Sequence, residues 1–373
     1  MRVTLVTGFL GSGKTTVVRR WLAEYGATER FGVVVNDLSE LEVDADLLRD
    51  GHHVSESDGT LSSVFAGSID RERRDLFRDT LMDYAARRVP HVLVETSGAT
   101  HPGPVIDAVT TSPGARLGAV VAVVDARAVH HDHDGGRRLA TLAASGATHA
   151  EVLLHAQIQA ATHVVVTKVD LVPESARQAI ADGLHAVNPT AGIVLCHYGR
   201  FDASPIFRVG PYQRTPLPAP PSPGPRAIES HVVRDPRPFH PGRLFRLYRE
   251  QLGLGVHRSK GFIWLASRPD QVLLWNQAGG AIGLEVLGFW KAAVANDAAL
   301  LREERELLAQ RLTSSHPIFG DRLNEVTVIG EPPDCGRFAQ ALATCFCTDD
   351  EVRHWCDGGA FDDPWPRSIR RLA

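Results

Sequence analysis

The sequence predicts an α/β domain built on a mostly parallel sheet, followed by a smaller α+β domain. In residues 1–206, Val-rich apolar runs alternate with helix-length segments, which is typical of strands buried on both faces by helices. Prolines crowd residues 207–230 and no hydrophobic period survives there, so this segment is predicted to be a linker. Beyond it, strand-like runs follow one another closely, which favours an α+β domain at 231–350 and a tail at 351–373.

The individual elements follow from these patterns. In the first domain we expect strands at 2–7, 31–36, 91–96, 118–125 and 161–167. In the second we expect strands at 260–266, 271–277, 281–290 and 324–330, with helices at 240–252 and near 338–346. Length and composition agree with this division, because 373 residues with 43% hydrophobic and 23% charged residues can form about two ordinary globular domains.

Charge and composition exclude several classes of partner. The formal net charge is −4, so we expect neither nucleic acid nor a membrane surface as a bulk partner. The apolar start of the chain is broken at Gly8, too short a run for a signal peptide or a membrane span, which predicts a cytoplasmic protein. The five cysteines are an odd number and are expected to be reduced thiols.

A glycine-rich stretch directly after the first expected strand carries the strongest signal. Residues 8–15 read GFLGSGKT, which fits G-x-x-x-x-G-K-[ST], and a helix-forming segment follows. Glycines let backbone N–H groups close around phosphates, Lys14 can reach the terminal phosphates as a catalytic group, and Thr15 can hold Mg²⁺. The alternative is a chance glycine-rich turn. We assign nucleotide contacts to Gly8, Gly11, Ser12, Gly13, Lys14, Thr15 and Thr16.

A second stretch bears on the identity of the base. Thr167-Lys168-Val169-Asp170 closes another apolar run, and P-loop GTPases have Asn/Thr-Lys-x-Asp in such a place. A carboxylate can accept from guanine N1–H and the exocyclic amine, whereas adenine offers no such pair of donors. Only four of the 40 basic residues are lysines, and Lys14 and Lys168 are two of them. Thr167, Lys168 and Asp170 therefore predict GTP and GDP as ligands, the alternative being a surface Lys-Asp pair.

An acidic residue closes the expected strand at 91–96. Glu95 begins Glu-Thr-Ser-Gly, and the carboxyl end of a parallel strand faces the crevice where ligands bind. We expect Glu95 to position Mg²⁺ or orient the attacking water, and Gly98 N–H to sense the γ-phosphate. The acidic stretch NDLSELEVD at 36–44 is either a nucleotide-responsive switch, in which Asp37 contacts the metal, or a solvated loop.

Together these residues resemble the CobW-like branch of the P-loop GTPases, which includes urease and hydrogenase maturation proteins. The matching segments are 8–16, 36–37, 95–98 with His101-Pro102, 123–126 and 167–171, and beyond the linker 237–244, 260–270, 275–280 and 320–330. The resemblance implies GTP hydrolysis coupled to metal delivery or metalloprotein maturation. We expect this hydrolysis to be slow without a partner, because the sequence identifies no arginine finger and no water-orienting Gln. The resemblance also implies a client protein that contacts the C-terminal domain, and it allows self-association.

The chain departs from this family at one position. Members usually carry Gly-Cys-x-Cys-Cys between the switch and the acid, with thiolates that bind Zn²⁺, whereas this chain has Gly59-Thr60-Leu61-Ser62-Ser63, a hydroxyl-rich stretch. Neutral hydroxyls are poor zinc ligands. The family's acidic switch residue is also shortened, from Glu to Asp37. The alternative function is therefore a nucleotide-gated partner-binding module with little hydrolysis and no metal transfer.

Other candidate ligands lie elsewhere in the chain. Histidines and carboxylates at 130–134 (HHDHD) and His52-His53 are either sites for Zn²⁺ or another transition metal, or solvated loops. Cys345 and Cys347, on an expected helix, favour a buried apolar role. His240 is expected to begin or cap a helix.

Overall fold

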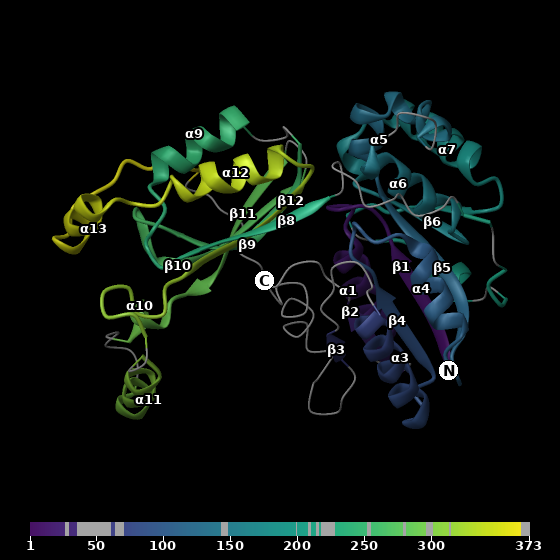
Figure 1. The fold of residues 1–373 in the computed structure, drawn as a ribbon, viewed down its shortest axis with the longest axis horizontal. Coiled ribbons are helices and arrows are strands. Elements are labelled where there is room, and N and C mark those ends of the chain that lie inside the picture. The colour runs from purple at the N-terminus through teal and green to yellow at the C-terminus, as the bar shows by residue number, and fades with distance from the viewer. Residues whose placement is uncertain are drawn as a thin grey trace. The chain divides into compact units, whose positions relative to one another are not determined.

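Figure 1 shows the computed structural model of the chain, which divides into two compact units, Met1–Ala227 and Ile228–Ala373. The residues that the structure describes are 1–26, 30–35, 61–63, 71–142, 148–198, 200–207, 210–213, 216–217, 228–251, 255–278, 281–295, 301–312 and 315–366. In this part of the chain, no helix has both the length and the apolar character needed to cross a membrane.

The first unit contains a seven-stranded sheet of order β3-β2-β4-β1-β5-β6-β7, in which neighbouring strands pair in parallel. Its strands are β1 (Arg2–Thr7), β2 (Phe31–Val35), β3 (Leu61–Ser63), β4 (His91–Glu95), β5 (Arg116–Asp125), β6 (His163–Thr167) and β7 (Gly192–Leu195). Its helices are α1 (Lys14–Tyr25), α3 (Arg71–Ala86), α4 (Pro102–Thr110), α5 (Ala126–Asp132), α6 (His149–Gln159), α7 (Glu174–Val187) and α8 (Ser204–Phe207). The predicted α/β class is confirmed.

Alternation along the strands explains why helices cover both faces of this sheet. In β1, Val6 packs with Val17 and Trp21 of α1, whereas Val3 and Leu5 belong to a second cluster with side chains of α3 and α4. Both clusters are fully buried, which accounts for the near-continuous valine runs. Because all strands are parallel, their carboxyl ends lie at one edge of the sheet, where the loops that carry the predicted motifs begin.

Two strands of the first unit were not predicted. The hydroxyl-rich stretch contributes β3, whose backbone pairs with β2 in the register Val33↔Leu61 and Val35↔Ser63. At the other edge, β7 pairs with β6. Both are short edge strands, and their sequences lack the long apolar runs that mark strands buried on two faces.

The second unit is an antiparallel sheet of five strands in the order β11-β10-β9-β12-β8. The strands are β8 (Glu229–Asp235), β9 (Val256–Leu265), β10 (Arg268–Ala278), β11 (Ala281–Phe289) and β12 (Asn324–Gly330). The helices are α9 (Pro241–Gln251), α10 (Lys291–Val294), α11 (Arg302–Leu312), α12 (Asp334–Ala343) and α13 (Asp349–Cys356). This arrangement confirms the predicted α+β class.

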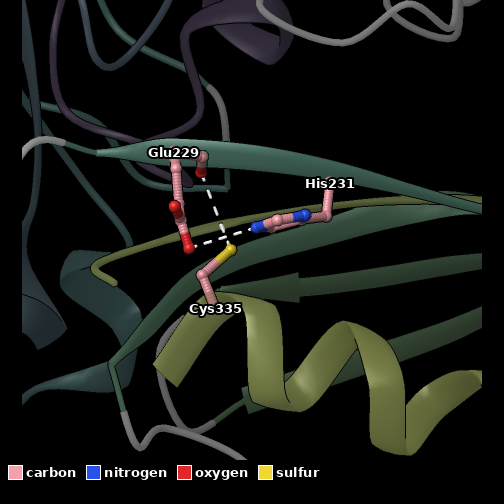
Figure 2. A group of neighbouring side chains, drawn as sticks. All are labelled: Glu229, His231 and Cys335. Atoms are coloured by element: carbon pink, nitrogen blue, oxygen red, sulfur yellow. Dashed lines mark hydrogen bonds and ion pairs between the residues drawn. The ribbon is translucent and has the colours of Figure 1, made fainter. Parts of the chain in front are cut away.

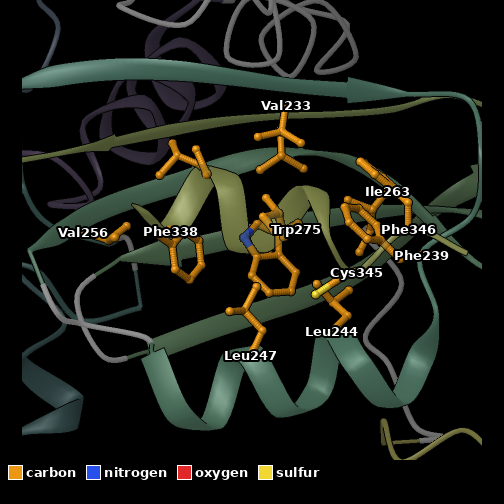
Figure 3. Packing of buried hydrophobic residues seen from close by; sticks show 14 of the residues in the cluster. Val233, Phe239, Leu244, Leu247, Val256, Ile263, Trp275, Phe338, Cys345 and Phe346 are labelled. Carbon is orange, nitrogen blue, oxygen red and sulfur yellow. The ribbon is translucent and has the colours of Figure 1, made fainter. Parts of the chain in front are cut away.

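Helices α9 and α12 lie over one face of this sheet, as Figure 1 shows. Their apolar residues, among them Leu244, Leu247 and Phe338, pack around the buried Trp275 of β10 (Figure 3). Trp365 completes the cluster and donates from Nε1 to Pro241 O over 3.1 Å, so residues assigned to the tail pack on this unit. Strand β8 begins at Glu229, within the last residues assigned to the linker.

His240 and the two cysteines have the predicted roles, but Cys345 and Cys347 do not lie on a helix as expected, because α12 ends at Ala343. His240 Nδ1 accepts from Gly242 N over 3.2 Å and so caps the start of α9. Cys345 and Cys347 are buried, and burial raises the pKa of the first thiol to about 11 and of the second to about 12. All five cysteines of the chain are free thiols.

Candidate nucleotide-binding site

The loop between β1 and α1 has a backbone that only glycines adopt readily. Gly8, Gly11 and Gly13 have φ values of 143°, 75° and 95°. A Cβ at Gly8 would lie 2.2 Å from Val123 O, so no side chain fits there. The glycines of the motif are therefore required by the turn itself, which leads from the strand into the start of α1.

Lys14 and Thr15 open helix α1 beside this loop. Lys14 is buried, and its Nζ donates to Gly8 O over 2.8 Å and to Phe9 O over 3.2 Å. Thr15 Oγ1 donates to Glu95 Oε1 over 2.7 Å. The parallel register Val6↔Glu95 explains this contact, because it places the carboxyl end of β4 next to the helix that follows β1.

These groups fit the magnesium ion of a nucleotide complex. A hydroxyl and a carboxylate are hard oxygen donors, which Mg²⁺ prefers, and it also takes phosphate oxygens and water. Thr15 and Glu95 are already at hydrogen-bond distance, so a small separation of the two oxygens would admit the ion between them or leave Glu95 to bind it through water. Both predicted residues are thus brought together, whereas Asp37 lies outside the described residues.

The loop after β4 lies against the phosphate loop. A Cβ on Gly98 would be 2.5 Å from Leu10 N and 2.7 Å from Leu10 Cα, so glycine is needed for this approach. On its other side, Gln157 of α6 donates from Nε2 to Gly98 O and to Thr100 O, both over 3.3 Å. Gln157 is fully buried, and no motif in the sequence indicated its role.

The loop with Thr167 and Lys168 is joined directly to the phosphate loop. Thr167 Oγ1 donates to Ser12 O over 2.7 Å, and Lys168 Nζ donates to Gly11 O over 2.9 Å. Lys168 has a φ of 56°, which turns the chain sharply after β6, and its ammonium also contacts Asp125 Oδ2 at 2.5 Å. Asp170 follows in a half-buried 3₁₀ turn.

Asp125 has a role that the sequence analysis did not assign. It ends β5, caps α5 by accepting from Arg127 N over 2.8 Å, and pairs with Lys168. One carboxylate therefore fixes both a helix start and the lysine that spans the two loops. The signals in the sequence were an acidic residue at the end of an apolar strand and the match of residues 123–126 to the family, neither of which gave Asp125 a role.

Other predicted ligands are not assembled. Within 130–134, His130 and His131 lie in the last turn of α5, and His133 follows with a pKa that burial lowers. The described residues contain one group of side chains close enough to hold a metal ion, and it does not include this histidine-rich segment. His52, His53, Gly59 and Thr60 lie outside the described residues.

These features define a nucleotide-binding protein of the P-loop class. They are a glycine loop between strand and helix, a Lys-Thr pair at the helix start, an acid on the neighbouring strand and a Thr-Lys-x-Asp loop. The chain belongs to the CobW family. Residues 2–195 match the family described as "CobW/HypB/UreG, nucleotide-binding domain", and residues 228–346 match "Cobalamin synthesis protein cobW C-terminal domain". The resemblance inferred from the motifs is confirmed.

Several proteins of known name are similar to the chain. Zinc-regulated GTPase metalloprotein activator 1 of Dictyostelium discoideum is 26% identical, over 97% of this chain and 84% of that protein. Zinc chaperone CobW of Sinorhizobium sp is 31% identical, over 48% of this chain and 54% of that protein. Zinc chaperone YjiA of Escherichia coli is 28% identical, over 55% and 60%. The crystal structure of Zn(II)-bound YjiA GTPase from E. coli matches at 18% identity with a TM-score of 0.36, covering 93% of this chain and 99% of that one.

Proposed function

We propose that the protein binds GTP and GDP with Mg²⁺ at this site, hydrolyses GTP slowly on its own, and couples the nucleotide state to metal handling for a client protein. The observation that carries the proposal is the direct connection between two loops. Thr167 and Lys168 bond to the carbonyl groups of Ser12 and Gly11, which places the predicted base-reading loop on the phosphate-binding loop.

The choice of base rests on Asp170. Its carboxylate can accept from both guanine N1–H and the exocyclic amine, and adenine has no equivalent pair of donors. The carbon stem of Lys168 runs beside the same loop, with its ammonium held by Gly11 O and Asp125. A rigid lysine of this kind offers an apolar surface on which a purine ring can pack.

Hydrolysis rests on Lys14, Thr15, Glu95 and Gly98. Lys14 and the glycine N–H groups neutralise phosphate charge, Thr15 and Glu95 would hold Mg²⁺, and the ion would neutralise charge on the β- and γ-phosphates. We propose that Glu95 orients the attacking water, directly or through the ion, and that Gly98 N–H contacts the γ-phosphate. The motifs supply neither an arginine finger nor a water-orienting glutamine, so we expect a partner to accelerate the reaction by several orders of magnitude.

Metal handling is proposed from the names of the relatives, several of which are zinc chaperones. In this chain the stretch Gly59-Thr60-Leu61-Ser62-Ser63 carries hydroxyl groups, and its part 61–63 runs beside β2 of the nucleotide-binding sheet. We propose that any metal held there is weakly bound, because hydroxyls do not supply the soft anionic ligands that zinc prefers. The replacement of the family's cysteines by hydroxyl residues also favours the second candidate function, a nucleotide-gated partner-binding module. For both candidate functions, we propose that the client protein binds the C-terminal unit.

The experiment is phosphate release from GTP by the purified chain, with and without zinc. Lys14→Ala and Thr15→Ala are expected to abolish turnover, whereas Lys291→Ala, on the C-terminal unit, is expected to leave it unchanged. Slow turnover that responds to zinc supports the coupled enzyme, and negligible turnover despite tight GTP binding supports the binding module. Fast turnover without metal or partner, or full activity of Lys14→Ala, contradicts the proposal.

A further inference from the structure

Three potential metal ligands meet at the edge of the C-terminal sheet. Glu229 and His231 lie two residues apart on β8, the edge strand, so their side chains share one face. Cys335 stands in the first turn of α12, which packs on β8. Figure 2 shows the three side chains pointing toward one another from these two elements.

The distances are close to those of a metal site. Glu229 Oε1 lies 3.1 Å from His231 Nε2, and the three ligand atoms, including Cys335 Sγ, all lie within 4.8 Å of one another. Tetrahedral zinc bonds of about 2.0–2.3 Å hold neighbouring ligand atoms roughly 3.3–3.8 Å apart. Small rotations of the Glu229 and His231 side chains would therefore close the group around an ion.

The two ligand residues on β8 are partly exposed, although His231 Nε2 itself is buried. Glu229 and His231 have side chains that are 36% and 42% exposed, while Cys335 is buried beneath them. The next residue along the helix is Gly336, where a Cβ would lie 3.5 Å from His231 Nε2, an ordinary contact distance.

We propose that Glu229, His231 and Cys335 form a binding site for Zn²⁺ in the C-terminal unit. Thiolate, imidazole and carboxylate are the ligand types that zinc takes in proteins. Cys335 would bind as the thiolate, with its proton passing to solvent. Burial and the nearby Glu229 raise the pKa of the free thiol to about 12, so the bound ion itself has to stabilise the negative charge. The proposed site uses none of the residues of the hydroxyl-rich stretch or of the nucleotide-binding motifs, and zinc binding there is expected without GTP.

The number of ligands indicates how such a site would work. Structural zinc sites have four protein ligands, whereas sites with three keep a position for water or an incoming group. With only three ligands, two of them partly exposed on the edge strand β8, this site would release zinc more readily than a four-cysteine site. It could therefore pass the ion to a ligand of another protein, which deepens the proposed metal handling without depending on hydrolysis.

Cobalt is the probe of choice, because a cobalt–thiolate bond produces a charge-transfer absorption band that histidine and carboxylate ligands alone do not give. The full-length, nucleotide-free chain is expected to show this band at one equivalent of Co²⁺ and to lose it when Zn²⁺ is added. Cys335→Ser is expected to abolish the band, whereas Cys345→Ser, another buried thiol, and Cys356→Ser, the exposed one, are expected to retain it.

Two further variants, Glu229→Gln and His231→Asn, test the site even if Cys335→Ser fails to fold. Both residues are partly exposed, so these substitutions are expected to leave the fold intact. Each is expected to weaken zinc about tenfold or more in competition with a chromophoric chelator, since one of three ligands is lost. The proposal is overturned if cobalt binds without a thiolate band, if the band survives in Cys335→Ser, or if both of the other variants bind zinc as the wild type does. GTP binding, measured in the same samples, reports separately on the proposed function.

Discussion

Replacing Thr167 with valine tests whether the base-reading loop supports the phosphate loop. Valine keeps the branched shape in β6 but removes the hydroxyl that donates to Ser12 O over 2.7 Å. The residue is buried, so the carbonyl of Ser12 loses its partner in a place with little water. Losing such a bond costs about 1–3 kcal/mol, which for a domain of this size lowers the melting temperature by roughly 2–12 °C.

The same change is expected to weaken nucleotide binding, because Ser12 belongs to the loop that surrounds the phosphates. If about 1–2 kcal/mol of binding free energy is spent on returning the phosphate loop to its wild-type conformation, the affinity for GTP falls roughly 5- to 30-fold. Isothermal titration with GTP measures this, alongside thermal unfolding. The control is Thr162→Val, which removes a similar 2.9 Å bond to Val120 O far from the phosphate loop. Equal GTP affinities in the two variants would refute the reasoning.

Three further predictions follow from single contacts. Gly98→Ala places a Cβ 2.5 Å from Leu10 N and is expected to weaken GTP binding at least about tenfold by titration, and unaltered affinity would contradict the close approach. Burial lowers the pKa of His91 from 6.5 to about 4, so the stability that this neutral histidine contributes is fully present above pH 6.5. As the pH drops toward 4, the free energy of unfolding is expected to fall by up to about 3 kcal/mol. Urea unfolding at several pH values measures this slope, which His91→Gln is expected to flatten. The hydrogen bond from Arg243 holds the pKa of Glu351 at about 2, below its usual 4.5. The stability that the ionised Glu351 contributes is therefore lost as the pH falls from 4.5 toward 2. Glu351→Gln is expected to remove that part of the acid unfolding transition, measured by circular dichroism.

The sequence predicts the parts of the site that are contiguous in the chain. The glycine loop at 8–15, Glu95 and the loop at 167–170 each follow a strand, and a parallel sheet must bring the carboxyl ends of its strands to one edge. That the three motifs meet at one edge of the sheet could therefore be expected from the sequence. The strand order, which places β4 beside β1 and so Glu95 beside Thr15, comes only from the fold.

What the sequence cannot give are pairs that packing brings together from distant positions. Gln157 reaches Gly98 O from α6, and nothing around it in the chain marks it as part of the site. Glu229 and Cys335 are more than a hundred residues apart, and they meet because β8 joins the sheet beyond β12 while α12 folds back on it. Strand β8 itself was hidden because it begins at the end of a proline-rich segment.

The central claim is that the chain is a guanine-nucleotide protein whose base is read by Asp170, and competition binding tests it directly. The wild type is expected to prefer GDP over ADP by about a hundredfold or more, since a two-donor contact is at stake. Asp170→Asn replaces the acceptor with an amide that can donate to xanthine, so this variant is expected to lose GDP and gain XDP, while Asp182→Asn keeps the wild-type preference. Equal affinity of the wild type for GDP and ADP, or an Asp170→Asn variant that still prefers GDP, would contradict the account.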